Sequence, residues 1–166
     1  MPTKKRSPNY SRNKGARAES DLVKLLRVKT GLQWERVPGS GALDEKHGLK
    51  GDCYVPNEKN LFCVEVKHYA EDHLTSKLLT SKTPQLLEWW SQAVRQGKQV
   101  SKLPMLFFKF DRSKWFVAFT ASAVSATFSG NLPPLGQYLY LGEEEIYLMQ
   151  IEEFFDNNEV RWILTL

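Results

Sequence analysis

The sequence predicts a mixed α/β domain in which helices flank a central β-sheet. Three features lead to this class: a helical repeat of apolar residues over 15–31, two short apolar runs with turn residues between them over 52–67, and an amphipathic helix over 83–97. Two more apolar runs follow that helix. The resulting order, α-β-β-β-α-β-β, favours a largely antiparallel or mixed sheet.

The first helix is expected over 15–31, because Ala18, Leu22 and Leu26 recur at helical spacing and a glycine ends the run. The next segment starts extended and becomes a loop in "RVPGSG", residues 36–41, where proline and glycine break any regular structure. The two strands of 52–67 follow, with a proline and two asparagines between them that favour a hairpin turn.

The second helix is expected in "TPQLLEWWSQAVRQG", with Thr83 as its N-cap, Pro84 in its first turn and Gly97 at its end. The runs "PMLFFKF" and "WFVAFT" then predict two strands joined around "DRSK". In the last part of the chain we expect a short helix in "ASAVSATFSG" and strands near 137–141 and 160–164.

Size and composition are those of one globular domain. The chain has 166 residues, of which 42% are apolar and 25% charged. No apolar run approaches the length of a membrane span, and no hydrophobic segment follows the basic N-terminal residues. We therefore expect no membrane association, no signal peptide and a cytoplasmic location. Cys53 and Cys63 lie inside apolar runs and are expected to be buried thiols.

The N-terminal segment is basic. Residues 1–18 contain six basic and no acidic side chains, although the whole chain carries only +4. We expect residues 1–14 to form a flexible arm that is attracted to a polyanion such as DNA, and residues 15–166 to form a single domain. A solvated arm that binds nothing is the alternative.

The charged end of the second hairpin strand is the strongest functional signal. Because side chains alternate along a strand, Val64 and Val66 share one face, which we expect to pack against a helix. Glu65 and Lys67 share the opposite face, about 7 Å apart. A surface ion pair at the strand exit is the simpler interpretation.

The register of the hairpin decides whether Asp52 joins this pair. A four-residue turn over 57–60 places Asp52 opposite Glu65, whereas a five-residue turn pairs it with Val64 and directs it to the other face. In the first register two carboxylates lie within about 5 Å of each other. A divalent cation with oxygen ligands, such as Mg²⁺, compensates for such repulsion.

Two neighbouring segments offer further groups for the same site. Glu19 projects from the apolar stripe of the first helix and is a candidate third carboxylate, although the helix dipole alone also favours a glutamate there. In the loop, Gly39 and Gly41 flank Ser40 and let the backbone approach a ligand closely. Arg36 can bind phosphate in bidentate fashion. A plain flexible turn is the alternative for this loop.

The order of these groups resembles the PD-(D/E)XK nuclease superfamily: Glu19 in the first helix, "RVPGSG", "GD" at 51–52 and "EVK" at 65–67. The basic segment "NKGARAESDLVKLL" and the loop are most similar to archaeal- and phage-type Holliday-junction resolvases within it. The resemblance covers about residues 14–67. Gly51 stands where the superfamily motif has a proline.

The resemblance implies a restriction-endonuclease-like core over about 15–120 and a C-terminal extension over 121–166. It implies that Asp52 and Glu65 bind Mg²⁺, which Mn²⁺ can replace. The further ligands and catalytic group that it implies are the Val66 carbonyl, Glu19, and Lys67, which would orient and help deprotonate the attacking water. The residues implied in DNA binding are Arg36, Gly39, Ser40, Gly41, Lys14 and Arg17.

The function implied is a magnesium-dependent, structure-selective DNA endonuclease of the Holliday-junction resolvase type. Such enzymes act as symmetric dimers on four-way junctions, here in a host cytoplasm if the chain is phage-encoded. One alternative is a replication-repair or restriction-type nuclease that cuts flaps or linear duplex. A DNA-binding module with a nuclease-like fold and no cleavage is the other.

Five other side chains are weaker candidates. Gln85, at the start of the second helix, is a candidate because glutamines touch the site in some branches of the superfamily, but it is also an ordinary first-turn residue. His68 and His73 follow the charged strand and can contact phosphate. Trp89 and Trp90 can stack on bases, although their helical spacing is more typical of core residues.

Overall fold

The structure is a computed structural model that describes residues 8–38, 49–120, 123, 137–141 and 144–156. Its helices are α1 (Pro8–Thr30), α2 (Lys77–Thr80), α3 (Gln85–Gln99) and α5 (Ile151–Asp156). Its strands are β1 (Glu35–Arg36), β2 (Cys53–Tyr54), β3 (Phe62–Tyr69), β4 (Leu103–Phe110), β5 (Phe116–Phe119), β6 (Gln137–Leu141) and β7 (Glu144–Gln150). These elements confirm the predicted α/β class.

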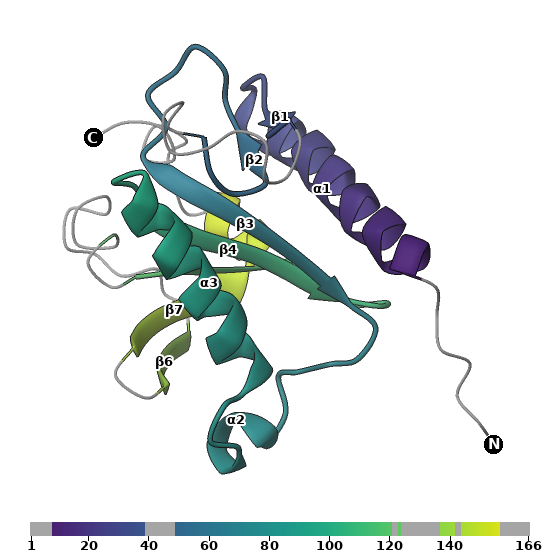
Figure 1. Cartoon of the computed structure of the whole chain (residues 1–166), viewed down its shortest axis with the longest axis vertical. Coiled ribbons are helices and arrows are strands. Elements are labelled where there is room, and N and C mark those ends of the chain that lie inside the picture. The colour runs from purple at the N-terminus through teal and green to yellow at the C-terminus, as the bar shows by residue number, and fades with distance from the viewer. Residues whose placement is uncertain (1–7, 39–48, 121–122, 124–136, 142–143, 157–166) are drawn as a thin grey trace.

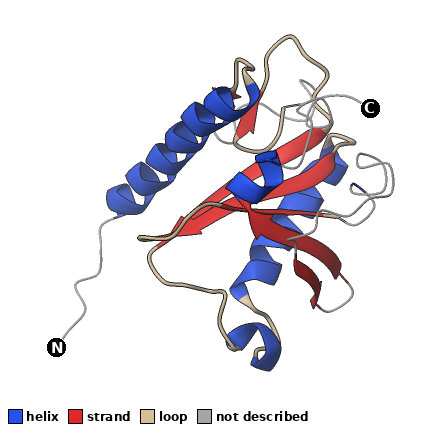
Figure 2. Cartoon of the chain, turned by 180° about the vertical axis from the view of Figure 1, so that it is seen from behind, coloured by secondary structure: helices blue, strands red, loops and turns tan. Residues whose placement is uncertain are grey.

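The described strands form one mixed sheet in the order β1-β2-β3-β4-β5-β7-β6. Only β3 and β4 run parallel within it, and α3 supplies the crossover that a parallel pair requires. Figure 1 shows α3 in front of the sheet and α5, in yellow, behind it. The reverse view in Figure 2 shows α1 and α5 on the other side. The domain thus has helices on both faces of its sheet.

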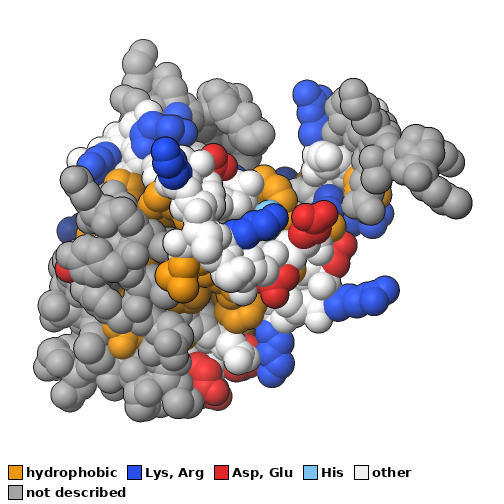
Figure 3. Space-filling model, turned by 90° about the horizontal axis from the view of Figure 1, so that it is seen from below, with side chains coloured by type: hydrophobic (Ala, Val, Ile, Leu, Met, Phe, Trp, Pro, Cys, Tyr) orange, Lys and Arg blue, Asp and Glu red, His pale blue; other side chains and the backbone are white. Residues whose placement is uncertain are grey.

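Charges of both signs are mixed on the surface. On the face shown in Figure 3, the basic side chains of the described residues are scattered among acidic and apolar ones. The described residues on this face therefore form no continuous basic band that would by itself mark a DNA-binding surface. Within the described part of the chain, no helix is both long and apolar enough to cross a membrane.

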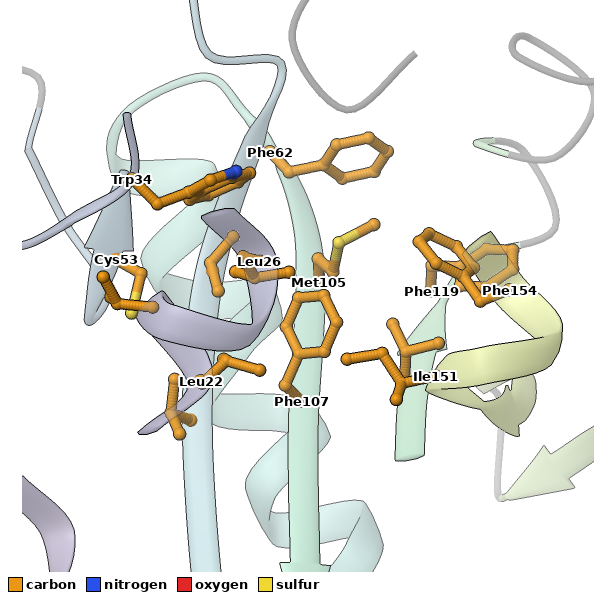
Figure 4. Close-up of a cluster of buried hydrophobic side chains, with 14 of the residues drawn as sticks. Leu22, Leu26, Trp34, Cys53, Phe62, Met105, Phe107, Phe119, Ile151 and Phe154 are labelled. Atoms are coloured by element: carbon orange, nitrogen blue, oxygen red, sulfur yellow. The ribbon is translucent and has the colours of Figure 1, made fainter. Parts of the chain in front are cut away.

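Two apolar cores hold the three layers together. One core lies between the sheet and the pair α1 and α5, as Figure 4 shows; it includes Leu22, Leu26, Phe62, Val64, Met105, Phe107, Ile151 and Phe154. The other lies under α3, where Trp89 and Trp90 are both buried and pack with Leu106 and Phe108. Neither tryptophan is thus exposed for stacking on bases. Cys53 and Cys63 are buried free thiols, as expected.

Both long helices differ from their predicted bounds. The first begins at Pro8, so the part of the expected arm from residue 8 onward is helical. Those first turns are polar and carry no apolar repeat that could reveal them. The third helix has Pro84 as its N-cap and continues past Gly97. Gly97 does not end the helix; a Cβ there would lie 2.6 Å from the carbonyl oxygen of Lys102, so glycine permits a close approach.

The last part of the chain extends the same sheet. The strand expected at 137–141 is β6, but β7 and α5 were not predicted, because "EEEIYLMQIEEFFD" has no glycine or proline to mark its elements. Strand β7 pairs with β5, so this region is continuous with the rest of the sheet. Most of the predicted helix in "ASAVSATFSG" and the whole of the strand at 160–164 lie outside the described residues.

The hairpin has the register that the four-residue turn requires. Cys53 pairs with Val64, as that turn requires, and the alternation of side chains then places Asp52 on the face of the sheet that Glu65 occupies. The side-chain amide of Asn60 fixes the turn: its Oδ1 accepts from the Val55 N–H and its Nδ2 donates to the Val55 carbonyl, both at 2.8 Å. The register prediction is therefore confirmed.

Gly51 brings the aspartate against β3. Its φ is +85°, and a Cβ there would lie 2.4 Å from the Val64 carbonyl oxygen. The adjacent Asp52 N–H donates to that same oxygen at 2.7 Å. A side chain at position 51 would separate the two strands, so the glycine is a packing requirement of this hairpin.

Candidate active site

The predicted carboxylates meet in a cleft of about 620 Å³. Its walls come from the first half of α1, the segment 49–52, the second half of β3, and α3. Both views show the first turns of α1 beside the arrowhead end of β3 (Figures 1 and 2). The charged and amide side chains that line the cleft include Glu19, Asp52, Glu65, Lys14, Lys50, Lys67, Gln92 and Gln96.

Asp52 is held from the neighbouring strand. Its Oδ2 accepts a 2.7 Å hydrogen bond from the backbone N–H of Val66, which also lines the cleft. Burial, followed by the nearby carboxylates of Glu65 and Glu19, raises the pKa of Asp52 to about 7, against the opposing effect of the Val66 N–H. Burial and the neighbouring carboxylates thus both oppose the ionisation of Asp52 in this cleft.

Among the described residues, Glu65 is the charged residue whose side chain is buried. Its Oε1 accepts from Lys67 Nζ at 2.6 Å and from Gln92 Nε2 at 2.7 Å. Its Oε2 is buried and has no hydrogen-bond partner among the described groups. Burial raises the pKa of Glu65, while Lys67 acts to lower it. An unsatisfied, buried carboxylate oxygen facing a cleft is suited to a cation.

Glu19 and Arg36 bind each other instead of pointing separately to a metal and a phosphate. The Arg36 Nη2 and Nε lie 2.6 and 2.7 Å from Glu19 Oε2. Strand β1 brings them together, because Arg36 pairs with Cys53 on the edge strand next to α1. Glu19 still lines the cleft, so its carboxylate lies within the site with a guanidinium attached.

The residues expected to bind DNA do not all lie at the cleft. Lys14 lines the cleft, and its Nζ forms a 2.8 Å ion pair with Asp111 at the end of β4. Arg17 is exposed on a different side of α1, in a shallow groove that Arg36 also lines. Gly39, Ser40 and Gly41 lie outside the described residues.

The histidines take separate positions. His68 lines the cleft, with its Nε2 2.9 Å from Asp111 Oδ1. Burial and the nearby charges of Lys14 and Lys109 lower the pKa of His68, although Asp111 acts to raise it. His73 instead contacts the rings of Tyr69, Trp89 and Phe110 and does not line the cleft.

Sequence reasoning missed the two glutamines that α3 directs at the site. Gln92 bonds to Glu65, and Gln96 lines the cleft one turn further along. Gln85, the glutamine considered from the sequence, donates to Glu88 and lies too early on the helix to reach the cleft. The spacing of four between Gln92 and Gln96 places both on one face of a helix, and this was the available signal.

A divalent cation fits these residues. Asp52 and Glu65 supply hard oxygen ligands from adjacent strands, and the unpartnered Oε2 of Glu65 is the kind of group that such an ion satisfies. No three acidic, histidine or cysteine side chains of the described residues are already gathered as a complete ligand set. The reason is visible in the contacts: Arg36 holds Glu19, and Lys67 with Gln92 holds Glu65.

Comparison with known proteins gives three results. The family model described as "Phage putative PDDEXK endonuclease" matches residues 10–164. Protein D14 of Escherichia phage T5 is 45% identical over 115 residues, which cover 68% of this chain and 72% of that protein.

Among solved structures, Hjc of Archaeoglobus fulgidus, a Holliday junction resolvase from an archaeal hyperthermophile, aligns with 89% of this chain and 93% of its own. Its TM-score is 0.41 and its identity 16%. The family match spans nearly the whole sequence, including every element of the cleft. The chain therefore belongs to the phage PD-(D/E)XK endonuclease family.

Proposed function

We propose that the chain is a divalent-metal-dependent DNA endonuclease that hydrolyses phosphodiester bonds in branched DNA, with the four-way junction as its principal substrate. The observation that carries the proposal is the convergence of Asp52, Glu65 and Lys67 in one cleft, on two antiparallel strands in the register that faces the carboxylates. A protein that only binds DNA gains nothing from carboxylates beside the phosphates, because they repel them.

The cleft residues have distinct roles in this proposal. Asp52 and Glu65 hold Mg²⁺, or Mn²⁺ in its place, and the Val66 carbonyl and Glu19 are further ligand positions. The bound ion supplies Lewis-acid stabilisation of the charge that develops on the phosphate and the departing oxygen. Lys67, whose ammonium group donates to Glu65, orients the attacking water and favours the loss of its proton to solvent. Gln92 keeps the Glu65 carboxylate in position.

Substrate binding follows from the cations around these carboxylates. Lys14 and Lys50 line the cleft and can contact phosphates on either side of the scissile bond. Arg36 can exchange its contact with Glu19 for a backbone phosphate when DNA enters. We further propose that the enzyme is a symmetric homodimer, because a two-fold axis presents two clefts to opposed strands of a junction.

The test uses end-labelled DNA of matched sequence as a four-way junction, a flap and a linear duplex, each incubated with and without Mg²⁺. We expect paired, symmetric nicks in the junction that require the metal, and no nicks with Asp52→Asn. Asp21→Asn is the matched control, since Asp21 is an exposed aspartate on α1. Cleavage of linear duplex at a similar rate would instead identify a flap or restriction-type nuclease. Binding without cleavage under any divalent metal would identify a DNA-binding module.

A further inference from the structure

Two tyrosines stand out among the exposed side chains. The large hydrophobic side chains of the described residues that are exposed are Tyr10, Val28, Tyr69 and Leu79. Both tyrosines line the active-site cleft, with 49% of Tyr10 and 41% of Tyr69 accessible, whereas the two aliphatic residues lie elsewhere. Among the described residues, the exposed large aromatic side chains therefore lie at the cleft that is proposed to bind DNA.

The ring of Tyr69 is held in place from behind. Its centroid lies 4.7 Å from the buried ring of Trp89 at an interplanar angle of 38°, and 5.8 Å from the ring of His73 in an edge contact. Trp89 is in turn packed against Phe108 and Phe110. A ring fixed by such a cluster loses little conformational entropy when a flat ligand stacks on it.

Tyr69 also has a defined position relative to the proposed chemistry. It lies two residues after Lys67 on β3, so both side chains project from the same face of the strand, about 7 Å apart. Two nucleotide steps along a stacked strand span about the same distance. A base on Tyr69 would thus lie one or two nucleotides from a phosphate at Lys67.

Tyr10 repeats this pairing of ring and cation on α1. It lies one helical turn before Lys14, so the two share a face of the helix. Lys14 is anchored by its ion pair with Asp111, which ties the start of α1 to the end of β4. The two walls of the cleft each present one lysine and one exposed tyrosine ring.

We propose that Tyr69 and Tyr10 are stacking platforms for unstacked nucleobases that flank the scissile phosphate. This assignment rests on the proposed DNA endonuclease function and narrows its substrate class to DNA with unstacked nucleotides beside the cleavage site. In a continuous duplex both faces of every internal base are covered by its neighbours, so a ring gains stacking only at branch points, forks and loops. The tyrosines thus favour branched DNA over continuous duplex, while the lysines bind the phosphate backbone of either.

The experiment measures binding in EDTA, so that its outcome does not depend on cleavage. Two DNAs of the same sequence are compared by fluorescence anisotropy: a fork with 2-aminopurine at its first unpaired position, and a fully paired duplex. Proteins are wild type, Tyr69→Leu, Tyr69→Phe, Tyr10→Leu, and the control Leu79→Ala, which alters an exposed side chain outside the cleft. Thermal melts establish that each variant is folded.

We expect each tyrosine-to-leucine change to weaken fork binding by about 5- to 150-fold and duplex binding by less than twofold. Wild type and Tyr69→Phe should quench 2-aminopurine, and Tyr69→Leu should not. Equal weakening of both DNAs, or unchanged binding to the fork, would overturn the proposal. Should Tyr69→Leu fail to fold, the binding data of Tyr10→Leu test the proposal instead. The Tyr10 side chain extends from an exposed face of α1, so its replacement should leave the fold intact. A protein that binds forks through these rings but cuts no DNA would refute the nuclease proposal alone.

Discussion

Val64 and Glu65 are neighbours on β3 and almost equally buried, with 1% and 2% of their surfaces accessible, yet they belong to different parts of the molecule. Val64 packs in the apolar core beneath α1, where its burial stabilises the fold. Glu65 faces α3, where burial opposes its charge and one oxygen is left without a partner. Equal burial thus has opposite energetic consequences on the two faces of one strand.

This difference shows on which face of β3 the domain gives up stability to place a charged side chain. On the α1 face, apolar residues are buried against apolar residues, so the packing there stabilises the fold. On the α3 face, the buried position is held by a glutamate, whose charge is compensated by hydrogen bonds from Lys67 and Gln92. Stability and activity should therefore respond oppositely to mutations on the two faces, and the following changes test this.

The largest expected effect is on cleavage by Glu65→Gln. The amide keeps the shape and can still accept a hydrogen bond from Lys67 Nζ, but it removes the negative charge that the proposed cation site requires. We expect cleavage of the four-way junction to fall about 1,000-fold or more, or ~4 kcal/mol, while the free energy of unfolding stays equal or rises. Glu58→Gln, at an exposed position of the hairpin turn, is the control. A variant that loses stability together with activity would show that Glu65 is a structural residue.

Gly51→Ala should reduce both stability and activity, because Gly51 lies where the segment before β2 packs against β3. The new Cβ would lie 2.4 Å from the Val64 carbonyl oxygen at a φ of +85°, so the hairpin must open and carry Asp52 away from β3. We expect a loss of about 2–4 kcal/mol in the free energy of unfolding and little remaining cleavage. In Gly31→Ala, φ is +71° but no atom lies within 4 Å, so only the left-handed strain of about 1–2 kcal/mol applies. Equal losses in the two variants, measured by urea denaturation, would contradict the clash argument.

Val64→Ala is the complementary change on the α1 face. It removes buried apolar surface from the core, and we expect a loss of about 1.5–3 kcal/mol in the free energy of unfolding. Because Val64 does not face the cleft, the cleavage rate of the folded variant should stay within about threefold of wild type. A much larger loss of activity at a temperature where the variant is fully folded would mean that the two faces are coupled.

The same contrast explains which features the sequence could predict. Periodicity identified α3 and the hairpin strands, whereas the turn residues left two registers open, of which the structure has the one with the four-residue turn. The contact between Arg36 and Glu19 could not be predicted, because it depends on how β1 lies beside α1. Gln92 and Gln96 could not be identified for a similar reason: their helix carries several polar residues, and the crossover geometry determines which of them face Glu65.

Acidity provides the smallest expected effect, and it depends on Asp52, whose pKa is raised to about 7 by burial and by the carboxylates of Glu65 and Glu19. Its ordinary value is 3.8, so protonated Asp52 favours the folded state. The resulting stability is fully present below about pH 4 and is lost as the pH rises through about 7.

In EDTA, Asp52→Asn should therefore gain stability over wild type between pH 5 and pH 8, by about 1–2 kcal/mol, because the neutral amide never buries a charge beside Glu65. Thermal melts at intervals across this range measure the gain. Saturating Mg²⁺ should reverse the order at pH 8, since the ion stabilises only a protein that can bind it. Parallel pH curves for the two proteins in EDTA would mean that Asp52 is ionised throughout and that the crowding of carboxylates, on which the cation site depends, is already neutralised by Arg36 and Lys67.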